Sequence, residues 1–326
     1  MNLPAARTQD APSWLVWLAL WTVYIVWGST YLAIRISVET LPPLLAASVR
    51  FLVAGALMAG FLMIKRGPRG IAVDRRELLA STLVGALLLL GGNGVVMLAE
   101  RDVPSGLAAL IIASTPLWVV LLRYVARERI DRGTLIGVAI GFVGVGILVA
   151  PGEKPDGAPV LGMLALVLAA LFWGTGSFLS KRLPLPSDPL TSTAWQMLTG
   201  GAVIAVAGVL SGEVADVDVS RFSLASVNAL IYLIVVGSLV AFTAYVWVLQ
   251  HAPISKVATY AYVNPVIAIF LGWLVLSEEI TPLVLAGAAV IVASVAFIIR
   301  RESQPPPTRH EELPDATPAL VGAEAS

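Results

Sequence analysis

Residues 27–35 read WGSTYLAIR, and residues 173–181 read WGTGSFLSK. In both segments a Trp-Gly pair and a hydroxyl residue stand inside an apolar stretch that ends on a basic residue, and the two copies are 146 residues apart. The same offset aligns Pro43 with Pro189. Repetition at a fixed offset indicates an internal duplication. The chain is therefore expected to consist of two related halves.

The repetition extends along the chain with little drift. At an offset of 149 residues Pro116 matches Pro265, and at 150 residues Glu128 matches Glu278. This predicts two repeat units, over about 14–150 and 160–300. The segment 302–326 alternates acids and prolines, and this composition predicts a disordered cytoplasmic tail.

The composition places both units in a membrane. Of the 326 residues, 58% are hydrophobic and 13% are charged, against about 45–50% and about 25% in soluble domains. Ten apolar stretches are long enough for helices that cross about 30 Å of hydrocarbon, and they lack the alternation of barrel strands. They run approximately over Trp14–Ile34, Pro43–Ile64, Leu78–Leu98, Ser105–Leu122, Gly133–Ala150, Val160–Ser180, Thr191–Leu210, Ser226–Leu249, Val257–Leu276 and Pro282–Ile299.

The basic residues orient these helices. Of the 21 Lys and Arg residues, sixteen fall on the side of the N-terminus, Arg50 lies inside a helix, and four fall on the other side. Because cytoplasmic segments carry the excess of Lys and Arg, both termini are expected in the cytoplasm. The four residues on the other side are Arg35, Arg101, Lys154 and Arg221.

Five helices in each unit mean that the second unit enters the membrane from the face opposite to the first. Two inverted units around a shared cavity form the architecture of many secondary transporters. We therefore expect an all-α polytopic membrane protein of ten helices, in two inverted five-helix repeats with alternating access to a central cavity. The alternative is a duplicated bundle with some other role.

Several of these motifs resemble the EamA family of the drug/metabolite transporter superfamily. They are the run 27–31 (WGSTY), Pro42-Pro43 followed by Arg50-Phe51, Pro116 followed by Glu128, and their second-half counterparts. Their order, spacing and repetition carry the resemblance, which is strongest to the YedA-like inner-membrane permeases. It implies a ten-helix fold, a central cavity, and export of amino acids or other small metabolites across the plasma (inner) membrane.

The sequence lacks the residues that several other functional classes of protein require. A formal net charge of zero provides no field for nucleic acid. There is no Cys, no Walker motif, and the two His residues lie in a loop and in the tail. We expect no enzyme activity, no cofactor and no metal. A membrane-embedded enzyme, or a structural or sensor protein without transport, is the alternative.

The expected partners are a small-molecule substrate and the lipid bilayer, and a monomer and a homodimer are both compatible with the sequence.

Arg50 is the one charged residue expected inside the membrane, about 10 Å from the end of its helix. A guanidinium there can bind a substrate carboxylate with two hydrogen bonds. Alternatively it extends outward to the membrane surface, or pairs with Glu39 or Glu100. The counterpart in the second half, Gln196, is neutral, so the role of Arg50 is not duplicated.

Further candidates share helix faces with polar or aromatic neighbours. Such faces either bind substrate or make hydrogen bonds between helices. Trp27 and Trp173 lie at mid-span and either line the cavity or pack against small residues. The candidates for substrate binding, besides Arg50 and Gln196, are Trp27, Asn93, Met97, Glu100, Trp173, Phe242, Tyr245, Tyr260 and Asn264.

Pro116 and Pro265 each remove a backbone donor inside a predicted helix, so a kink is expected at each. Such discontinuities are typical of gating or binding segments of transporters.

Gly133, Gly137 and Gly141 form a GxxxG series, which predicts close helix packing. Among titratable groups only Glu100 is placed to carry a proton, so uniport, exchange and proton antiport are all compatible with the sequence.

Overall fold

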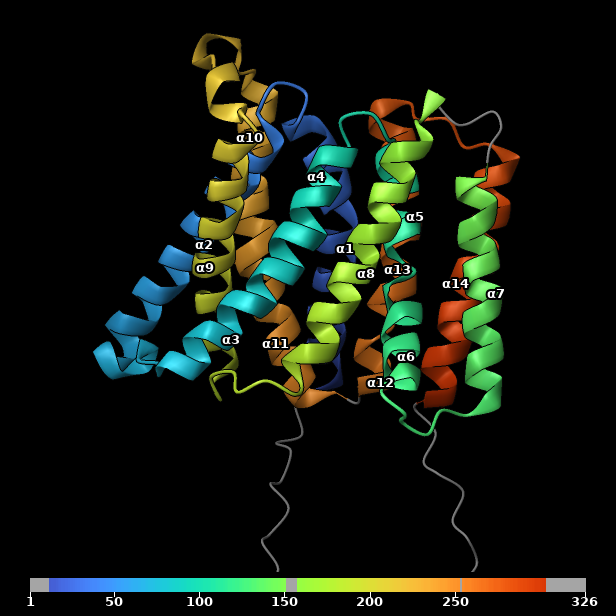
Figure 1. The fold of residues 1–326 in the computed structure, drawn as a ribbon, viewed down its shortest axis with the longest axis horizontal. Helices are drawn as coiled ribbons and strands as arrows, with labels where there is room; N and C mark the ends of the chain where they lie inside the picture. The colour runs from blue at the N-terminus through green and yellow to red at the C-terminus, as the bar shows by residue number, and fades with distance from the viewer. Residues whose placement is uncertain (1–11, 151–156, 253, 303–326) are drawn as a thin grey trace, which may run out of the picture.

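The computed structural model describes residues 12–150, 157–252 and 254–302, and these residues form helices joined by turns (Figure 1). Within these ranges, nine helical segments are long and apolar enough to cross a membrane, and a tenth, Tyr260–Leu276, is a shorter apolar helix. In chain order the elements are α1 (Ser13–Ser37), α2 (Pro43–Arg66), η1 (Pro68–Ile71), α3 (Arg75–Gly85), η2 (Ala86–Gly94), α4 (Val95–Ala99), α5 (Ser105–Ile112), α6 (Thr115–Val125), α7 (Arg132–Val149), α8 (Val160–Ser180), α9 (Pro189–Leu210), η4 (Glu213–Asp216), η5 (Val219–Arg221), α10 (Leu224–Tyr232), η6 (Leu233–Val240), α11 (Ala241–His251), α12 (Ile254–Val257), α13 (Tyr260–Leu276) and α14 (Pro282–Glu302).

The ten expected stretches all correspond to helical segments, with several differences in detail, among them an interruption of the fourth at 113–114. The third and eighth segments each contain a stretch of π-helix, η2 and η6. The ninth is interrupted, so that α13 begins at Tyr260 rather than at Val257. Glu302, the expected start of the tail, is the last residue of α14, where it accepts hydrogen bonds from Arg123. The rest of the expected tail lies outside the described residues.

The helices run alternately up and down through the bundle. α1 begins and α14 ends at the bottom in Figure 1, an end that we call the terminal face; the other end is the opposite face. α8, the first helix of the second half, starts at the opposite face and runs down. The fold is therefore the expected all-α bundle with two inverted halves of five membrane segments.

The two halves meet along α2 and α9, where repeat-related glycines permit close approach. A Cβ atom on Gly55 of α2 would lie 3.0 Å from Leu198 of α9. In return, a Cβ on Gly201 of α9 would lie 3.0 Å from Leu52 of α2. At the opposite face the Glu213 carboxylate accepts hydrogen bonds from the first-turn N–H groups of α2. Because the contact is reciprocal, the interface between the halves follows the internal two-fold axis.

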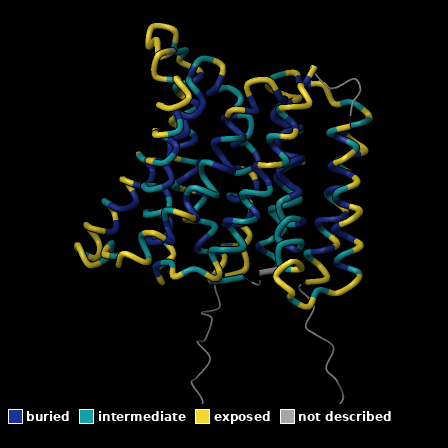
Figure 2. The backbone as a smooth tube through the Cα atoms, in the orientation of Figure 1, coloured by how far each residue is buried: buried dark blue, intermediate teal, exposed yellow. Residues whose placement is uncertain are grey.

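The flanks of the bundle expose apolar side chains. Figure 2 shows buried residues concentrated inside and exposed residues along the outer turns of the peripheral helices. The exposed large side chains include Ile64, Leu161 and Leu210. An apolar exterior around a packed interior is what hydrocarbon requires of a multi-pass membrane protein.

The GxxxG series on α7 packs against α14, as the sequence predicts. A Cβ on Gly137 would lie 3.0 Å from Ile298, and one on Gly144 would lie 2.9 Å from Ile291. The hydroxyl of Ser294 donates to the carbonyl oxygen of Gly137 at 2.6 Å. Small residues are what allow two helix backbones to come this close in lipid.

Substituting one glycine of this series is expected to destabilise the fold. A Cβ on Gly141 would lie 2.6 Å from Leu117 and 2.7 Å from the Ser294 hydroxyl. Gly141→Leu should therefore force α7 away from its neighbours at a cost of about 1–3 kcal/mol. Gly146→Leu, on the same helix where no atom lies within 4 Å of the added Cβ, is the matched control. Thermal unfolding followed by tryptophan fluorescence should show a lower Tm for the first variant only; equal values would contradict the packing role.

Candidate functional site

Four of the candidate side chains form one aromatic cluster, which we call the aromatic cluster throughout. The ring of Trp27 on α1 lies 4.9 Å from that of Tyr245 on α11 and 5.1 Å from that of Tyr260 on α13. Tyr245 and Tyr260 are 5.7 Å apart, edge to face, and Phe242 is 6.2 Å from Tyr245. Residues from three helices thus meet at mid-bundle, and they offer ring faces to an apolar or cationic group.

Asn264 connects two of these helices. With its amide oriented to satisfy its neighbours, the side-chain nitrogen donates to the carbonyl oxygens of Tyr260 at 3.2 Å and Tyr24 at 3.3 Å. The second of these bonds joins α13 to α1. Of the two interpretations, the hydrogen bond between helices is the one that the described contacts favour for this residue.

The Trp-Gly pairs of both halves lie against the residue that precedes a proline. A Cβ on Gly28 would lie 3.2 Å from the carbonyl oxygen of Asn264, and one on Gly174 would lie 3.5 Å from that of Thr115. Asn264 precedes Pro265, and Thr115 precedes Pro116. The repeated Trp-Gly and proline motifs are therefore contact partners in both halves.

The two prolines differ in their effect on the helix. Pro116 stands in the first turn of α6, after an interruption at 113–114. The side chains of Ser114 and Thr115 donate there to the carbonyl oxygens of Ile111 and Ile112. Pro265 lies inside α13, and the interruption in that half comes earlier, at 258–259. An interruption therefore directly precedes Pro116, whereas α13 continues through Pro265 and the interruption in that half lies more than a turn before the proline.

Arg50 is buried, with only 5% of its surface exposed. Its Nε donates to the hydroxyl of Ser238 on η6 at 3.1 Å, and its Nη1 has no hydrogen-bond partner. Among the described residues no ion pair joins it to Glu39 or Glu100. The described contacts therefore favour neither extension to the surface nor a structural ion pair, and a buried cation retains an uncommitted N–H donor.

Each π-helical stretch contains a polar side chain that donates a hydrogen bond to the backbone of the same stretch. Asn93 Nδ2 donates to the carbonyl oxygen of Leu88 at 3.4 Å, five residues back, and Ser238 Oγ donates to that of Leu233 at 2.9 Å, also five residues back. π-Helical segments occur frequently at functional sites. Since Ser238 also accepts from Arg50, η6 positions the guanidinium.

The remaining candidates are spread over the bundle. Met97 is fully buried in the main core. Trp173 packs on Gly92 of η2, where a Cβ would lie 2.8 Å from the indole. Gln196 Nε2 donates to Ser192 on its own helix at 2.9 Å. Because α9 runs opposite to α2, Gln196 lies toward the terminal face and Arg50 toward the opposite face.

Glu100 follows the end of α4 at the opposite face and is completely buried. Neither of its carboxylate oxygens has a hydrogen-bond partner. The guanidinium of Arg35 donates to the backbone carbonyl oxygens of Glu100 and Arg101, and not to this carboxylate. The structure thus buries an acid whose oxygens are free to bind a proton or a cationic group.

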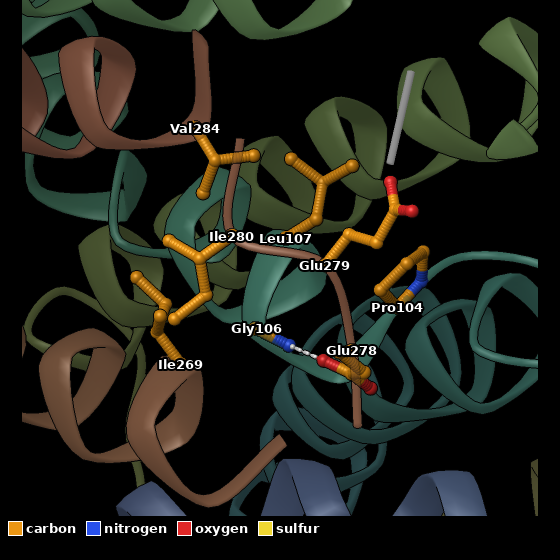
Figure 3. Close-up of a pocket in the computed structure, with 8 residues that line it drawn as sticks. All are labelled: Pro104, Gly106, Leu107, Ile269, Glu278, Glu279, Ile280 and Val284. Atoms are coloured by element: carbon orange, nitrogen blue, oxygen red, sulfur yellow. Dashed lines mark hydrogen bonds between the residues drawn. The ribbon is translucent and has the colours of Figure 1, made fainter. Parts of the chain in front are cut away.

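A contact between two distant segments lies at the opposite face, and the sequence does not predict it. Glu278 accepts hydrogen bonds from the backbone N–H groups of Ser105, at 2.7 Å, and Gly106, at 3.0 Å, in the first turn of α5. Figure 3 shows the bond from Gly106. The adjoining pocket between Leu107, Glu279 and their neighbours has a free volume of about 10 Å³, the least that holds one water molecule. The carboxylate therefore fastens the loop before α14 onto α5.

The repeat counterpart, Glu128, has different partners. Both glutamates follow a residue with positive φ, Arg127 and Ser277, so the local turn is the same. Glu128 accepts hydrogen bonds from Arg123, at 2.8 Å, and from Arg182. The hydrogen bond from Arg123 lowers the pKa of Glu128. The two repeat-related glutamates therefore have different contacts at the two faces, although their local sequences are related.

Comparisons with known proteins agree with this architecture. The EamA-like transporter family matches the chain twice, over residues 13–150 and 160–300. The chain is 36% identical over 281 residues to the "Uncharacterized inner membrane transporter YedA" of Escherichia coli (strain K12), covering 86% of this chain and 89% of that protein. It is 24% identical to the "Uncharacterized transporter YoaV" of Bacillus subtilis (strain 168), covering 86% and 95%. A crystal structure with 21% sequence identity superposes with a TM-score of 0.59, covering 90% of this chain and 100% of that one, and shows the shared fold.

Proposed function

The chain belongs to the EamA-like transporter family of multi-pass membrane proteins, and on that premise we propose that it exports amino acids or related small metabolites across the plasma membrane by alternating access. Its relatives are named as transporters, one of them of the inner membrane. The terminal face, which holds most of the basic residues, is the cytoplasmic face in this proposal.

The buried Arg50 guanidinium is the observation that supports the substrate class. A buried cation with an uncommitted donor is unfavourable unless an anion compensates for it. A Cβ on Gly237 of η6 would lie 3.6 Å from Arg50 Nη2 and 3.1 Å from Thr30 of α1, which is one turn from Trp27. A carboxylate bound at Arg50 would thus place its attached side chain toward the aromatic cluster. Amino acids and small carboxylates combine a carboxylate for Arg50 with an attached group that can contact the aromatic cluster.

The different partners of Glu128 and Glu278 support alternating access. In this arrangement Glu278 holds the opposite face closed. The residues that correspond to Ser105 and Gly106, at the offset of 149, are Ile254 and Ser255 at the start of α12. In the exchanged arrangement Glu128 leaves its arginines and binds the backbone there, while Glu278 releases α5. Two inverted repeats have two such near-equivalent states.

Reconstitution tests this function directly. Liposomes containing the purified protein are loaded with a mixed pool of amino acids, carboxylates and polyamines, and mass spectrometry follows which compounds leave. We expect selective loss of amino acids or small carboxylates, at rates well above those of protein-free liposomes. If every compound leaves at the protein-free rate, the proposed function is wrong. If polyamines leave instead, transport stands and the anion-binding role of Arg50 is wrong.

A further inference from the structure

Glu100, the buried acid at the opposite face, has no role in the transport proposal as stated so far. Glu100 is 0% exposed, and it follows the membrane-spanning segment Arg75–Ala99. A carboxylate in such a place needs hydrogen-bond donors to remain ionised, since an isolated buried charge is very costly. Both of its oxygens lack donors. The neutral acid is the form that these surroundings favour.

A second carboxylate at the same face strengthens this preference. Glu278 interacts electrostatically with Glu100, and its carboxylate accepts hydrogen bonds from two backbone N–H groups. When two neighbouring acids compete in this way, the one without donors holds the proton. In the closed arrangement that acid is Glu100.

The other groups that face Glu100 do not offset its preference for the neutral form. Arg35 on α1 donates to backbone carbonyl oxygens, and Arg50 on α2 donates to Ser238. Tyr31 on α1 is near enough for its phenol to interact with the charge of Glu100. Burial, followed by the charge of Glu278, raises the pKa of Glu100 well above its ordinary value, and Arg35 and Arg50 lower it by less.

We propose that the Glu100 carboxyl is a proton-binding site, and that a proton and the ammonium group of an amino-acid substrate occupy it in turn, which makes transport a proton antiport. The coupling rests on the proposed function, whereas the proton site does not. An amino acid carries one group for each of two unpartnered sites: a carboxylate for Arg50 and an ammonium for Glu100. The two sites are electrostatically coupled.

The cycle balances as a transfer of one proton. With the opposite face open, water delivers a proton to a carboxylate oxygen of Glu100 as the substrate ammonium leaves, and an O–H bond forms. With the terminal face open, the arriving ammonium displaces that proton, the O–H bond breaks, and the proton passes to water on the cytoplasmic side. Because the proton and the ammonium group cannot occupy the site at the same time, their movements in opposite directions are coupled.

The proton site can be tested without a substrate. Stability conferred by an acid whose pKa is raised on folding is present at low pH and is lost as the pH rises through the raised value. The Tm of the wild-type protein should therefore fall between about pH 5 and about pH 9 by more than that of Glu100→Gln. Asp102→Asn, an exposed acid two residues away, should follow the wild type. Identical pH profiles for the wild type and Glu100→Gln would overturn the proton site.

Infrared spectroscopy gives the same test in the unaltered protein. Ionised carboxylates and a protonated carboxyl absorb at different frequencies, so the wild type should retain a protonated-carboxyl band at neutral pH. That band should be missing from Glu100→Gln and present in Asp102→Asn. If the wild-type spectrum has no such band, Glu100 is ionised and the proposal is wrong, whatever the variants do.

The coupling is tested with liposomes loaded with the twenty standard amino acids as the probe. Acidifying the outside by about one pH unit provides a driving force of about tenfold for one proton per turnover. We expect faster amino-acid loss from wild-type and Asp102→Asn liposomes on acidification, and no acceleration by the gradient for Glu100→Gln. Loss that the gradient leaves unchanged in the wild type overturns the coupling and leaves the transporter proposal intact. No loss at any pH overturns the transporter proposal and the coupling with it, while the stability and infrared results still decide the proton site.

Discussion

Replacing Arg50 with glutamine is expected to lower the rate of carboxylate transport by roughly a hundredfold, which corresponds to about 3 kcal/mol of lost binding. Glutamine is the residue that the second half has at this position, Gln196, so the substitution suits a helix of this kind. What it removes is a buried guanidinium with an uncommitted Nη1 donor. Efflux from loaded liposomes at low substrate concentration measures the loss.

Two further measurements separate substrate binding from a structural role of Arg50. Arg50→Lys retains the charge but loses the planar pair of donors, so transport should stay low. The Tm of Arg50→Gln should equal or exceed that of the wild type, because no partner carboxylate is left unpaired. Ser238→Ala should lower transport less, since it frees Arg50 without removing it. A large drop in the Tm of Arg50→Gln, or unchanged transport, would contradict the assignment.

Replacing Glu278 with alanine is expected to open the opposite face. The substitution leaves the N–H groups of Ser105 and Gly106 without their acceptor, a loss of about 2 kcal/mol that shifts a two-state equilibrium about thirtyfold. Hydrogen–deuterium exchange should therefore rise strongly in the peptide that contains these two amides. In the wild type the same peptide should be protected.

Glu279→Ala provides the matched control for this variant, because Glu279 is the next residue in the chain and is exposed, whereas the acceptor of both amides is Glu278. Glu278→Gln, which retains one acceptor oxygen, should give an intermediate rise. Faster exchange in Glu279→Ala as well would indicate general loosening of the loop rather than loss of the carboxylate contact. Unchanged exchange in Glu278→Ala would remove Glu278 from the account.

The membrane segments could be predicted from the sequence because hydrocarbon imposes a length and an apolar composition on each of them. The two halves could be predicted from motif offsets such as Trp27 to Trp173. Close helix packing could be predicted from Gly133, Gly137 and Gly141, although the partner helix, α14, could not. These patterns are local or periodic, so they can be recognised in a single sequence.

Other features depend on contacts between distant segments, which a single sequence does not contain. The π-helical stretches are apolar, as α-helical membrane segments are, so the sequence of residues 86–94 does not predict which type of helix forms there. The match of Glu128 with Glu278 was visible, but not that Glu278 would bind α5, 172 residues away in the chain. Arg50 and Glu100 were recognised as unusual charges, whereas their lack of ion-pair partners required coordinates.

Alternating access is the central claim, and spin-label distances across both faces test it most directly. The chain has no cysteine, so labels can be attached at pairs of introduced cysteines: Asp102→Cys with Glu279→Cys at the opposite face, and Arg129→Cys with His251→Cys at the terminal face. In lipid, adding Glu278→Ala should lengthen the first distance and shorten the second, because opening one face closes the other. If both distances lengthen together, or only the first changes, the two faces do not exchange and the account is wrong.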